Sequence, residues 1–118
     1  MKKFYYLKTC NTCMRILNEI DLPEDFEMRE IKTVPITATE LDEMKALAES
    51  YEALFSKRAR LYKEMNLKDE NLTEDDFKKH ILSHYTFLKR PVIIYDNSIF
   101  IGNSSKVIKN AKMTIHGK

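Results

Sequence analysis

The sequence is poor in glycine and cysteine, and it has no long apolar run. Its two glycines, Gly102 and Gly117, cannot supply a glycine-rich phosphate-binding loop. No stretch approaches the roughly 20 apolar residues of a membrane-spanning helix. Two cysteines are too few for a disulfide scaffold. In a reducing compartment, a close pair of cysteines is more often catalytic or metal-binding than structural.

What is present indicates a globular protein. A chain of 118 residues is long enough for one ordinary core and too short for two, so we expect a single domain over residues 1–118. The formal charge of +2 is too small to make nucleic acid an expected partner, and we expect no membrane partner either. The start, "MKKFYYLKTC", reaches a lysine too early for the apolar centre of a signal peptide, which predicts a cytoplasmic location.

The first third of the chain predicts a βαβ unit. Aromatic residues at 3–7 are typical of a short strand, and the polar "KTCNTC" loop follows it. Apolar residues then recur at helical spacing until "DLPED" ends the helix. Residues 26–31 alternate apolar with charged side chains, the period of a strand with one covered face. Two such strands joined by a helix should lie parallel, with a right-handed crossover.

The middle of the chain is predicted to be helical. Thr37 with Glu40 forms the pattern of a capping box, and Thr73 with Asp76 repeats it. Between them, "SYEALFSKRARLYKEMNL" has helical periodicity, and we expect a helix there in preference to a break near Ser56. After Thr73 the expected inward face of the last helix consists of Phe77, Ile81, Leu82 and Tyr85.

The last third predicts a hairpin and a closing helix. "RPVIIYDNSIFIGN" is rich in β-branched and aromatic residues and is split by the turn sequence "DNS". Ser104 or Ser105 then caps a helix. The whole order predicts an α/β, thioredoxin-like fold: a βαβ unit plus a C-terminal β-hairpin and helix, with a helical insertion at about 37–85.

The two cysteines lie between the first strand and the first helix, the position of a redox motif in a βαβ unit. Cys10 falls at the helix start, where free amides and the helix dipole favour a thiolate, so we predict that it is the nucleophile. Cys13 follows one turn later, within reach of a disulfide, and is predicted to resolve a mixed disulfide on Cys10. Arg15 either adds positive potential at the cysteines or points to solvent.

A second candidate site is the Arg90-Pro91 step. The residue before a proline is held extended, and such a bond is the usual place for a cis peptide, so Pro91 is a predicted cis-proline. If it opens the strand beside the first helix, Arg90 lies near Cys10 and can hold an oxyanion or stabilise the thiolate. The basic residues Lys57 and Arg60 are better explained as a solvated surface.

The two cysteines have two alternatives to redox chemistry, a zinc site and a buried structural role. His80 and His84, four residues apart, complete a C-x2-C and H-x3-H ligand set for zinc, but the gap after Cys13 is far longer than in a zinc finger. We therefore predict no metal site. The other alternative is that the two cysteines are small buried hydrophobes. The surrounding residues Lys8, Thr9, Asn11 and Thr12 are polar and favour exposed cysteines.

These motifs together resemble the ArsC/Spx family, which includes the glutaredoxin-coupled arsenate reductases and the Spx regulators. The likeness covers nearly the whole chain and depends on the cysteine near residue ten, "LFSKRARLYKEMNL", and "LKRPVIIYDNSIFIG" before a closing helix. It implies the thioredoxin-like fold and an oxyanion or disulfide substrate. It also implies reduction through glutathione and glutaredoxin, or through thioredoxin, with no bound cofactor. The predicted anion-binding residues are Thr12, Arg15, Arg58 and Arg90.

The sequence departs from both branches of that family. Ser56 stands where the arsenate reductases have the first of three arginines, the third is replaced within "FIGNSS", and Tyr6 replaces a histidine before the cysteine. Cys13 resembles the second cysteine of Spx-type members, which bind RNA polymerase, but Ser50 replaces their glycine. We therefore predict a cytoplasmic, arsenate-reductase-like thiol-disulfide oxidoreductase. The alternatives are a Spx-like regulator switched by a Cys10-Cys13 disulfide and, less favoured, a structural zinc protein.

Overall fold

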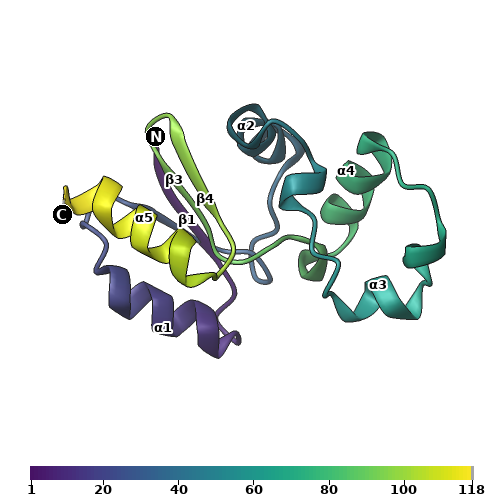
Figure 1. Cartoon of the computed structure of the whole chain (residues 1–118), viewed down its shortest axis with the longest axis horizontal. Helices are drawn as coiled ribbons and strands as arrows, with labels where there is room; N and C mark the ends of the chain where they lie inside the picture. The colour runs from purple at the N-terminus through teal and green to yellow at the C-terminus, as the bar shows by residue number, and fades with distance from the viewer. Residues whose placement is uncertain (118) are drawn as a thin grey trace. The chain divides into compact units, whose positions relative to one another are not determined.

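Figure 1 shows a computed structural model of the chain, which describes residues 1–117. The chain divides into two compact units. The first consists of Met1–Val34 together with the chain from Arg90 onward, and the second is Pro35–Lys89. The second unit corresponds to the predicted helical insertion and extends slightly beyond it at both ends. That the two units form a single domain stays a prediction.

The first unit contains a four-stranded sheet. Its strands are β1 (Lys2–Tyr6), β2 (Glu27–Glu30), β3 (Val92–Tyr95) and β4 (Ser98–Ile101), in the order β2-β1-β3-β4. β1 and β2 are parallel, whereas β1 pairs with β3 and β3 with β4 in antiparallel fashion. This is the predicted α/β, thioredoxin-like arrangement of a βαβ unit followed by a hairpin.

Two helices, α1 (Asn11–Ile20) and α5 (Ser105–His116), cover one face of this sheet (Figure 1). Residues of the sheet and of both helices share one apolar core, whose buried members include Phe4, Ile16, Ile93 and Ile108. At their far ends the helices are joined by a hydrogen bond of 2.7 Å from His116 Nε2 to the Ile20 carbonyl. Ser104 is the cap of α5, one of the two serines predicted for that role.

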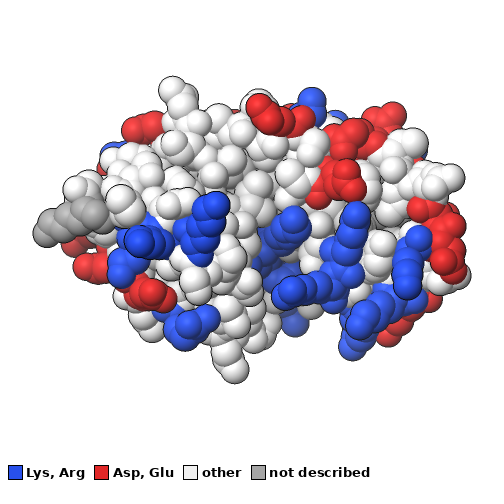
Figure 2. Space-filling model, in the orientation of Figure 1, with Lys and Arg blue, Asp and Glu red and all other residues white. Residues whose placement is uncertain are grey.

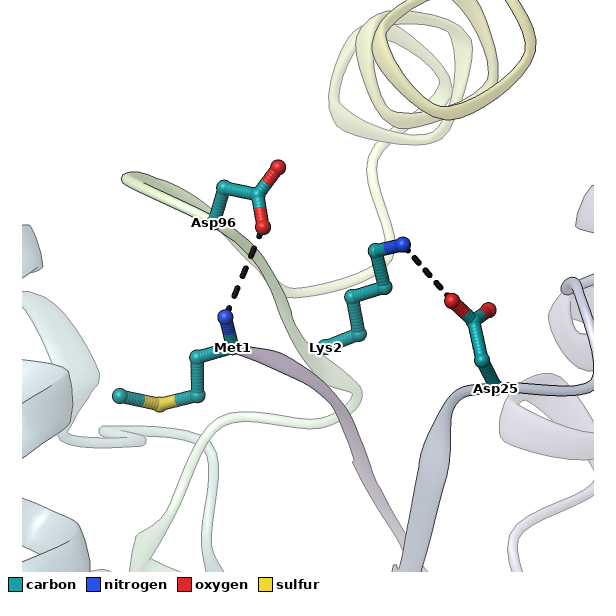
Figure 3. A network of polar contacts seen from close by, with 4 residues as sticks. All are labelled: Met1, Lys2, Asp25 and Asp96. Carbon is teal, nitrogen blue, oxygen red and sulfur yellow. Dashed lines mark hydrogen bonds and ion pairs between the residues drawn. The ribbon is translucent and has the colours of Figure 1, made fainter.

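The start of β1 is held by polar contacts with two neighbouring segments (Figure 3). The amino group of Met1 lies 3.5 Å from Asp96 in the β3–β4 turn, and the Asp96 amide donates to the Met1 carbonyl. Lys2 Nζ forms a 2.7 Å ion pair with Asp25, just before β2. Exposed pairs of this kind contribute little energy, so the strand order depends on the backbone pairing of the sheet.

The second unit is entirely helical in its regular elements. They are α2 (Ala38–Ala48), η1 (Glu52–Leu54), α3 (Arg60–Glu64), η2 (Leu67–Asp69), α4 (Glu74–Ser83) and η3 (Tyr85–Phe87), the η elements being 3₁₀ turns. Both predicted capping boxes are present, at Thr37 with Glu40 and at Thr73 with Asp76. No helix in residues 1–117 combines the length and the apolar character needed to cross a membrane.

Two details of the predicted insertion are wrong. The helix expected through "SYEALFSKRARLYKEMNL" is broken between η1 and α3, because Phe55 is extended and pairs with Leu88. The Ser56 amide donates to the Phe87 carbonyl at 2.7 Å, a contact that local periodicity cannot reveal. The last predicted helix also ends earlier, since α4 stops at Ser83 and Tyr85 belongs to η3. Leu82, expected on the inward face, is 38% exposed.

Candidate functional site

Cys10 occupies the cap position of α1, where the extended chain turns into the helix. Its amide donates to the Leu7 carbonyl at 3.0 Å, and its own carbonyl accepts from the Met14 amide at 3.1 Å. The first turn of α1 carries no acidic residue, so no carboxylate competes for the free amides there. The helix start therefore faces the sulfur with its positive end.

The environment of Cys10 lowers the pKa of its thiol. Partial burial acts in the opposite direction, but it is outweighed by the Cys13 amide, the Cys13 thiol, the charge of Arg90 and the Thr12 amide. Each of these favours the thiolate by donating to it or by placing positive charge nearby. Because Cys10 also keeps part of its surface open, its thiolate can meet a substrate.

Cys13 is fully buried, at 0% exposure, which corrects the expectation that both cysteines are exposed. The polar residues around the pair in sequence point outward, whereas the helical turn directs Cys13 toward the sheet side of α1 with Ile16 and Ile20. Burial, together with its hydrogen bond to Cys10, raises the pKa of Cys13 to about 11, although the Leu7 amide opposes this. The two sulfurs are thus neighbours with opposite shifts, and both are reduced here.

The Arg90-Pro91 peptide bond is cis, as predicted. Pro91 directly precedes β3, which pairs with β1, so the chain delivers Arg90 to the end of the sheet where α1 begins. The charge of Arg90 acts on both thiols and lowers the pKa of each. The structure therefore brings Cys10, Cys13 and Arg90 together.

Sequence reasoning missed Glu30, which braces the loop that leads to Cys10. Its carboxylate accepts from the Lys8 amide at 2.8 Å, the Lys32 amide at 2.9 Å and the Thr33 amide at 2.7 Å. Burial alone would raise the pKa of Glu30, but these three donors lower it by more than that. The pKa of Glu30 is therefore below its usual value. The parallel pairing of Tyr6 with Glu30 could have revealed this contact, because it puts Glu30 beside the end of β1.

A sequence model described as the ArsC family matches residues 5–111. The chain belongs to the ArsC family. Two curated relatives are named global transcriptional regulator Spx. Spx 1 of Bacillus cereus is 26% identical over 113 residues, covering 92% of this chain and 85% of the relative. Spx of Bacillus subtilis is 24% identical over the same length and the same shares.

Solved structures of the ArsC type have the same fold. Arsenate reductase from Vibrio cholerae superposes with a TM-score of 0.69 at 18% identity, covering 98% of this chain and 95% of that one. An arsenate reductase related protein from Brucella melitensis has a TM-score of 0.69 at 18% identity, covering 92% of each chain. At these identities the likeness shows the thioredoxin-like fold of the ArsC family and nothing finer.

The predicted anion-binding residues of this ArsC-family chain belong to both units. Thr12 contributes its amide to the Cys10 sulfur. Arg15 lines a groove between α1 and α5. Arg58 is exposed and belongs to the second unit, so its role at an anion stays a prediction.

The histidines considered for zinc have other contacts. His80 packs against the rings of Phe55 and Phe87, with centroids 6.3 and 5.3 Å away. The His84 ring accepts a hydrogen bond from the Thr86 amide at 3.2 Å. Within residues 1–117, no three His, Cys, Asp or Glu side chains are grouped so that they could hold a metal ion.

Proposed function

We propose that this ArsC-family protein is a thiol-disulfide oxidoreductase in which Cys10 is the nucleophile and Cys13 the resolving thiol. The observation that carries the proposal is the placement of the two cysteines: Cys10 caps the start of α1 and stays partly exposed, whereas Cys13 is buried one turn later. The pKa shifts agree with it, lowered at Cys10 and raised to about 11 at Cys13. A thiolate attacks disulfides, whereas a thiol does not, so the first attack belongs to Cys10.

The reaction transfers two electrons from the two cysteines to the substrate. The Cys10 thiolate attacks one sulfur of a substrate disulfide, forms a mixed disulfide with it and releases the other sulfur as a thiolate, which takes a proton from water. Cys13 then attacks the Cys10 sulfur, and its proton passes to the substrate sulfur that leaves. This forms the Cys10–Cys13 disulfide and releases the second substrate thiol. An external dithiol reductant, of the glutaredoxin or thioredoxin kind, restores the reduced pair.

Charge around the pair supports the two steps. Arg90 lowers the pKa of both thiols, so it favours the attacking thiolate in each half of the reaction. An oxyanion substrate such as arsenate would use the same charge with the Thr12 amide, and Arg58 is the further candidate for that role. The family's arsenate reductases support this narrower substrate proposal, but the departures at Ser56 and Tyr6 weigh against it.

The test uses the reduced full-length protein and a peptide disulfide with a fluorescent group on one arm. We expect Cys10→Ser to reduce the initial release of the fluorescent thiol at least about a hundredfold. Cys13→Ser should still attack once and then accumulate a mixed disulfide on Cys10, visible in the intact mass. Undiminished release by Cys10→Ser, or no trapped adduct with Cys13→Ser, would contradict the assigned roles. Arsenate with glutathione and glutaredoxin tests the narrower substrate.

A redox-switched regulator is the second candidate, and the Spx relatives favour it. In this reading the Cys10–Cys13 disulfide alters a surface that binds RNA polymerase. Purified polymerase should then be retained by the oxidised protein and not by the reduced one. Cys13→Ser serves as the control, because it cannot form the disulfide. Equal retention of all three forms would remove this candidate.

A further inference from the structure

We infer that the groove between α1 and α5 is a docking site for an acidic segment of a partner polypeptide. The groove has a volume of about 490 Å³, within the range of about 300 to 1,000 Å³ of typical binding pockets. One wall carries Arg15 and Glu19 from α1, and the other carries Lys109 and Lys112 from α5, so three basic side chains face one acidic side chain in the lining. Figure 2 shows several Lys and Arg side chains, with Asp and Glu side chains among them, over the surface that these helices form.

The three cationic side chains of the groove have no ion-pair partner within the part of the chain that the structure describes. Elsewhere in the chain cations form ion pairs, such as Lys2 with Asp25 and Lys78 with Asp42. Over residues 1–117, the side chains of Arg15, Lys109 and Lys112 form neither an ion pair nor a hydrogen bond. Their charge is therefore available to a partner.

The placement of the lysines does not serve the stability of α5. The helix Ser105–His116 contains no acidic residue, so its lysines have no intrahelical ion pair. Lys109 and Lys112 lie three residues apart, a spacing at which like charges repel and cost a few tenths of a kcal/mol. A helix surface that tolerates this repulsion fits a ligand with negative charge.

An acidic polypeptide fits the lining better than a small anion does. The groove runs along α5 from Ser105 to Met113, about 12 Å at the helical rise. Its cationic side chains lie on opposite walls, and the Met113 side chain, which is 48% exposed, adds an apolar surface. A segment with several carboxylates and one apolar side chain matches this spread, since methionine packs against varied apolar shapes.

The groove lies close to the cysteines within the first unit. β1 and β4 each pair antiparallel with β3, so they run in the same direction, and α1 and α5 begin at the same end of the sheet. Arg15 follows Cys10 by five residues, about 7.5 Å along the helix. An acidic segment held there would deliver a neighbouring disulfide to Cys10. This delivery of a disulfide rests on the proposed function, whereas the binding of an acidic segment in the groove does not.

The first experiment measures binding by fluorescence anisotropy at low ionic strength, where screening is weak. The probe is a labelled, cysteine-free peptide with alternating Glu and Leu, compared with the same peptide carrying Gln for Glu. We expect the acidic peptide to bind and the Gln peptide to bind at least roughly tenfold more weakly. The double variant Lys109→Gln with Lys112→Gln should lose roughly tenfold in affinity for the acidic peptide.

Lys106→Gln is the matched control, because Lys106 is exposed on the same helix but does not line the groove. It should change the affinity less than twofold. Equal binding of both peptides would overturn the inference, and so would equal losses from Lys106→Gln and the double variant. Citrate is tested as a small anion. If it binds more tightly than the acidic peptide and is lost in the double variant, the groove takes small ligands and the inference is wrong.

The second experiment separates docking from the chemistry. Two peptide disulfides, one flanked by Glu and one by Gln, are compared as substrates of the reduced protein. We expect a higher kcat/KM for the acidic one, and the double lysine variant should remove this preference while keeping turnover of the Gln substrate. If neither is reduced while Cys10→Ser still binds the acidic peptide, the proposed function fails and the docking site stands. Equal kcat/KM values mean that the groove does not select the substrate.

Discussion

Cys10 and Cys13 lie one helical turn apart at the start of α1, and the interaction of their thiols lowers the pKa of Cys10 and raises that of Cys13. Burial raises the pKa of both thiols. At Cys10 the donors and the Arg90 charge outweigh it, whereas at Cys13 the hydrogen bond to Cys10 adds to it. One sulfur is thereby prepared to attack while the other is held as a thiol.

The first prediction is that only Cys10 reacts with iodoacetamide in the native reduced protein near neutral pH. Its rate should follow the thiolate fraction, with a midpoint below the ordinary cysteine value of about 8.5. Cys13 should react only as the pH approaches about 11, or after unfolding. Mass spectrometry of tryptic peptides measures each cysteine separately.

Cys10→Ser is the control for that measurement. It should stay unlabelled at neutral pH in the native state and take up one label in strong denaturant, since Cys13 is buried. Labelling of native Cys10→Ser at the rate of a free thiol would contradict the burial of Cys13. A Cys10 midpoint at or above the ordinary value would contradict thiolate stabilisation by the helix start.

The second prediction concerns the hydrogen bond between the two sulfurs. Cys13→Ala removes the donor and should raise the pKa of Cys10, while Cys13→Ser keeps a hydroxyl that can donate and should raise it less. The pH dependence of Cys10 alkylation measures both. Equal pKa values in the wild type and in Cys13→Ala would show that the thiol contributes nothing.

The sequence alone predicted the strands, the closing helix and both capping boxes, because each depends on local signals. Thr37 with Glu40 and Thr73 with Asp76 lie three residues apart, and the turn "DNS" splits the hairpin. The break around Phe55 could not be read in this way. Phe55 is extended because it pairs with Leu88, more than thirty residues later, and this long-range contact overrides helical periodicity.

Part of the candidate site was also predictable from the sequence, because it depends on local signals. The cap position of Cys10 and the cis Arg90-Pro91 bond follow from neighbouring residues. The burial of Cys13 and the groove position of Arg15 depend on how α1 packs against the sheet and α5, which side-chain polarity alone does not fix. Glu30 was missed because its three donors belong to two separate loops that only the parallel pairing of β1 and β2 brings together.

The third prediction tests the charge of Arg90. Arg90→Gln should raise the pKa of Cys10, and Arg90→Lys should largely preserve it, because the positive charge is what acts on the thiolate. The measurement is again the pH dependence of alkylation. Arg15→Gln is the matched control, since it removes the same charge from the lining of the groove between α1 and α5. Equal shifts from Arg15→Gln and Arg90→Gln would mean that general surface charge is responsible.

The fourth prediction concerns Glu30 and pH. Its pKa is lowered in the folded protein, so its ionised form stabilises the fold above the unfolded value of about 4.5. That contribution is lost as the pH falls through the folded pKa. Glu30→Gln should lower the free energy of unfolding by about 1 to 2 kcal/mol at pH 7, and the difference from wild type should shrink below about pH 4.5.

Urea unfolding at several pH values measures this difference. Glu24→Gln is the control, because Glu24 is exposed and its substitution removes the same charge from the same unit. It should change the free energy of unfolding by less than about 0.5 kcal/mol at every pH. A loss in Glu30→Gln that does not depend on pH would show that the carboxylate charge is not what holds the Lys8 amide.

The fifth prediction concerns the aromatic core of the second unit. Phe55 packs against Phe77 and Phe87, with ring centroids 4.9 and 5.3 Å away, and it is 1% exposed. Phe55→Ala should therefore cost about 3 to 5 kcal/mol in the free energy of unfolding, measured with urea. Met65→Ala, at a site that is 47% exposed in the same unit, should cost less than about 0.5 kcal/mol. If the two substitutions cost the same, the ring cluster does not hold the extended Phe55 segment in place, and the break between η1 and α3 needs another cause.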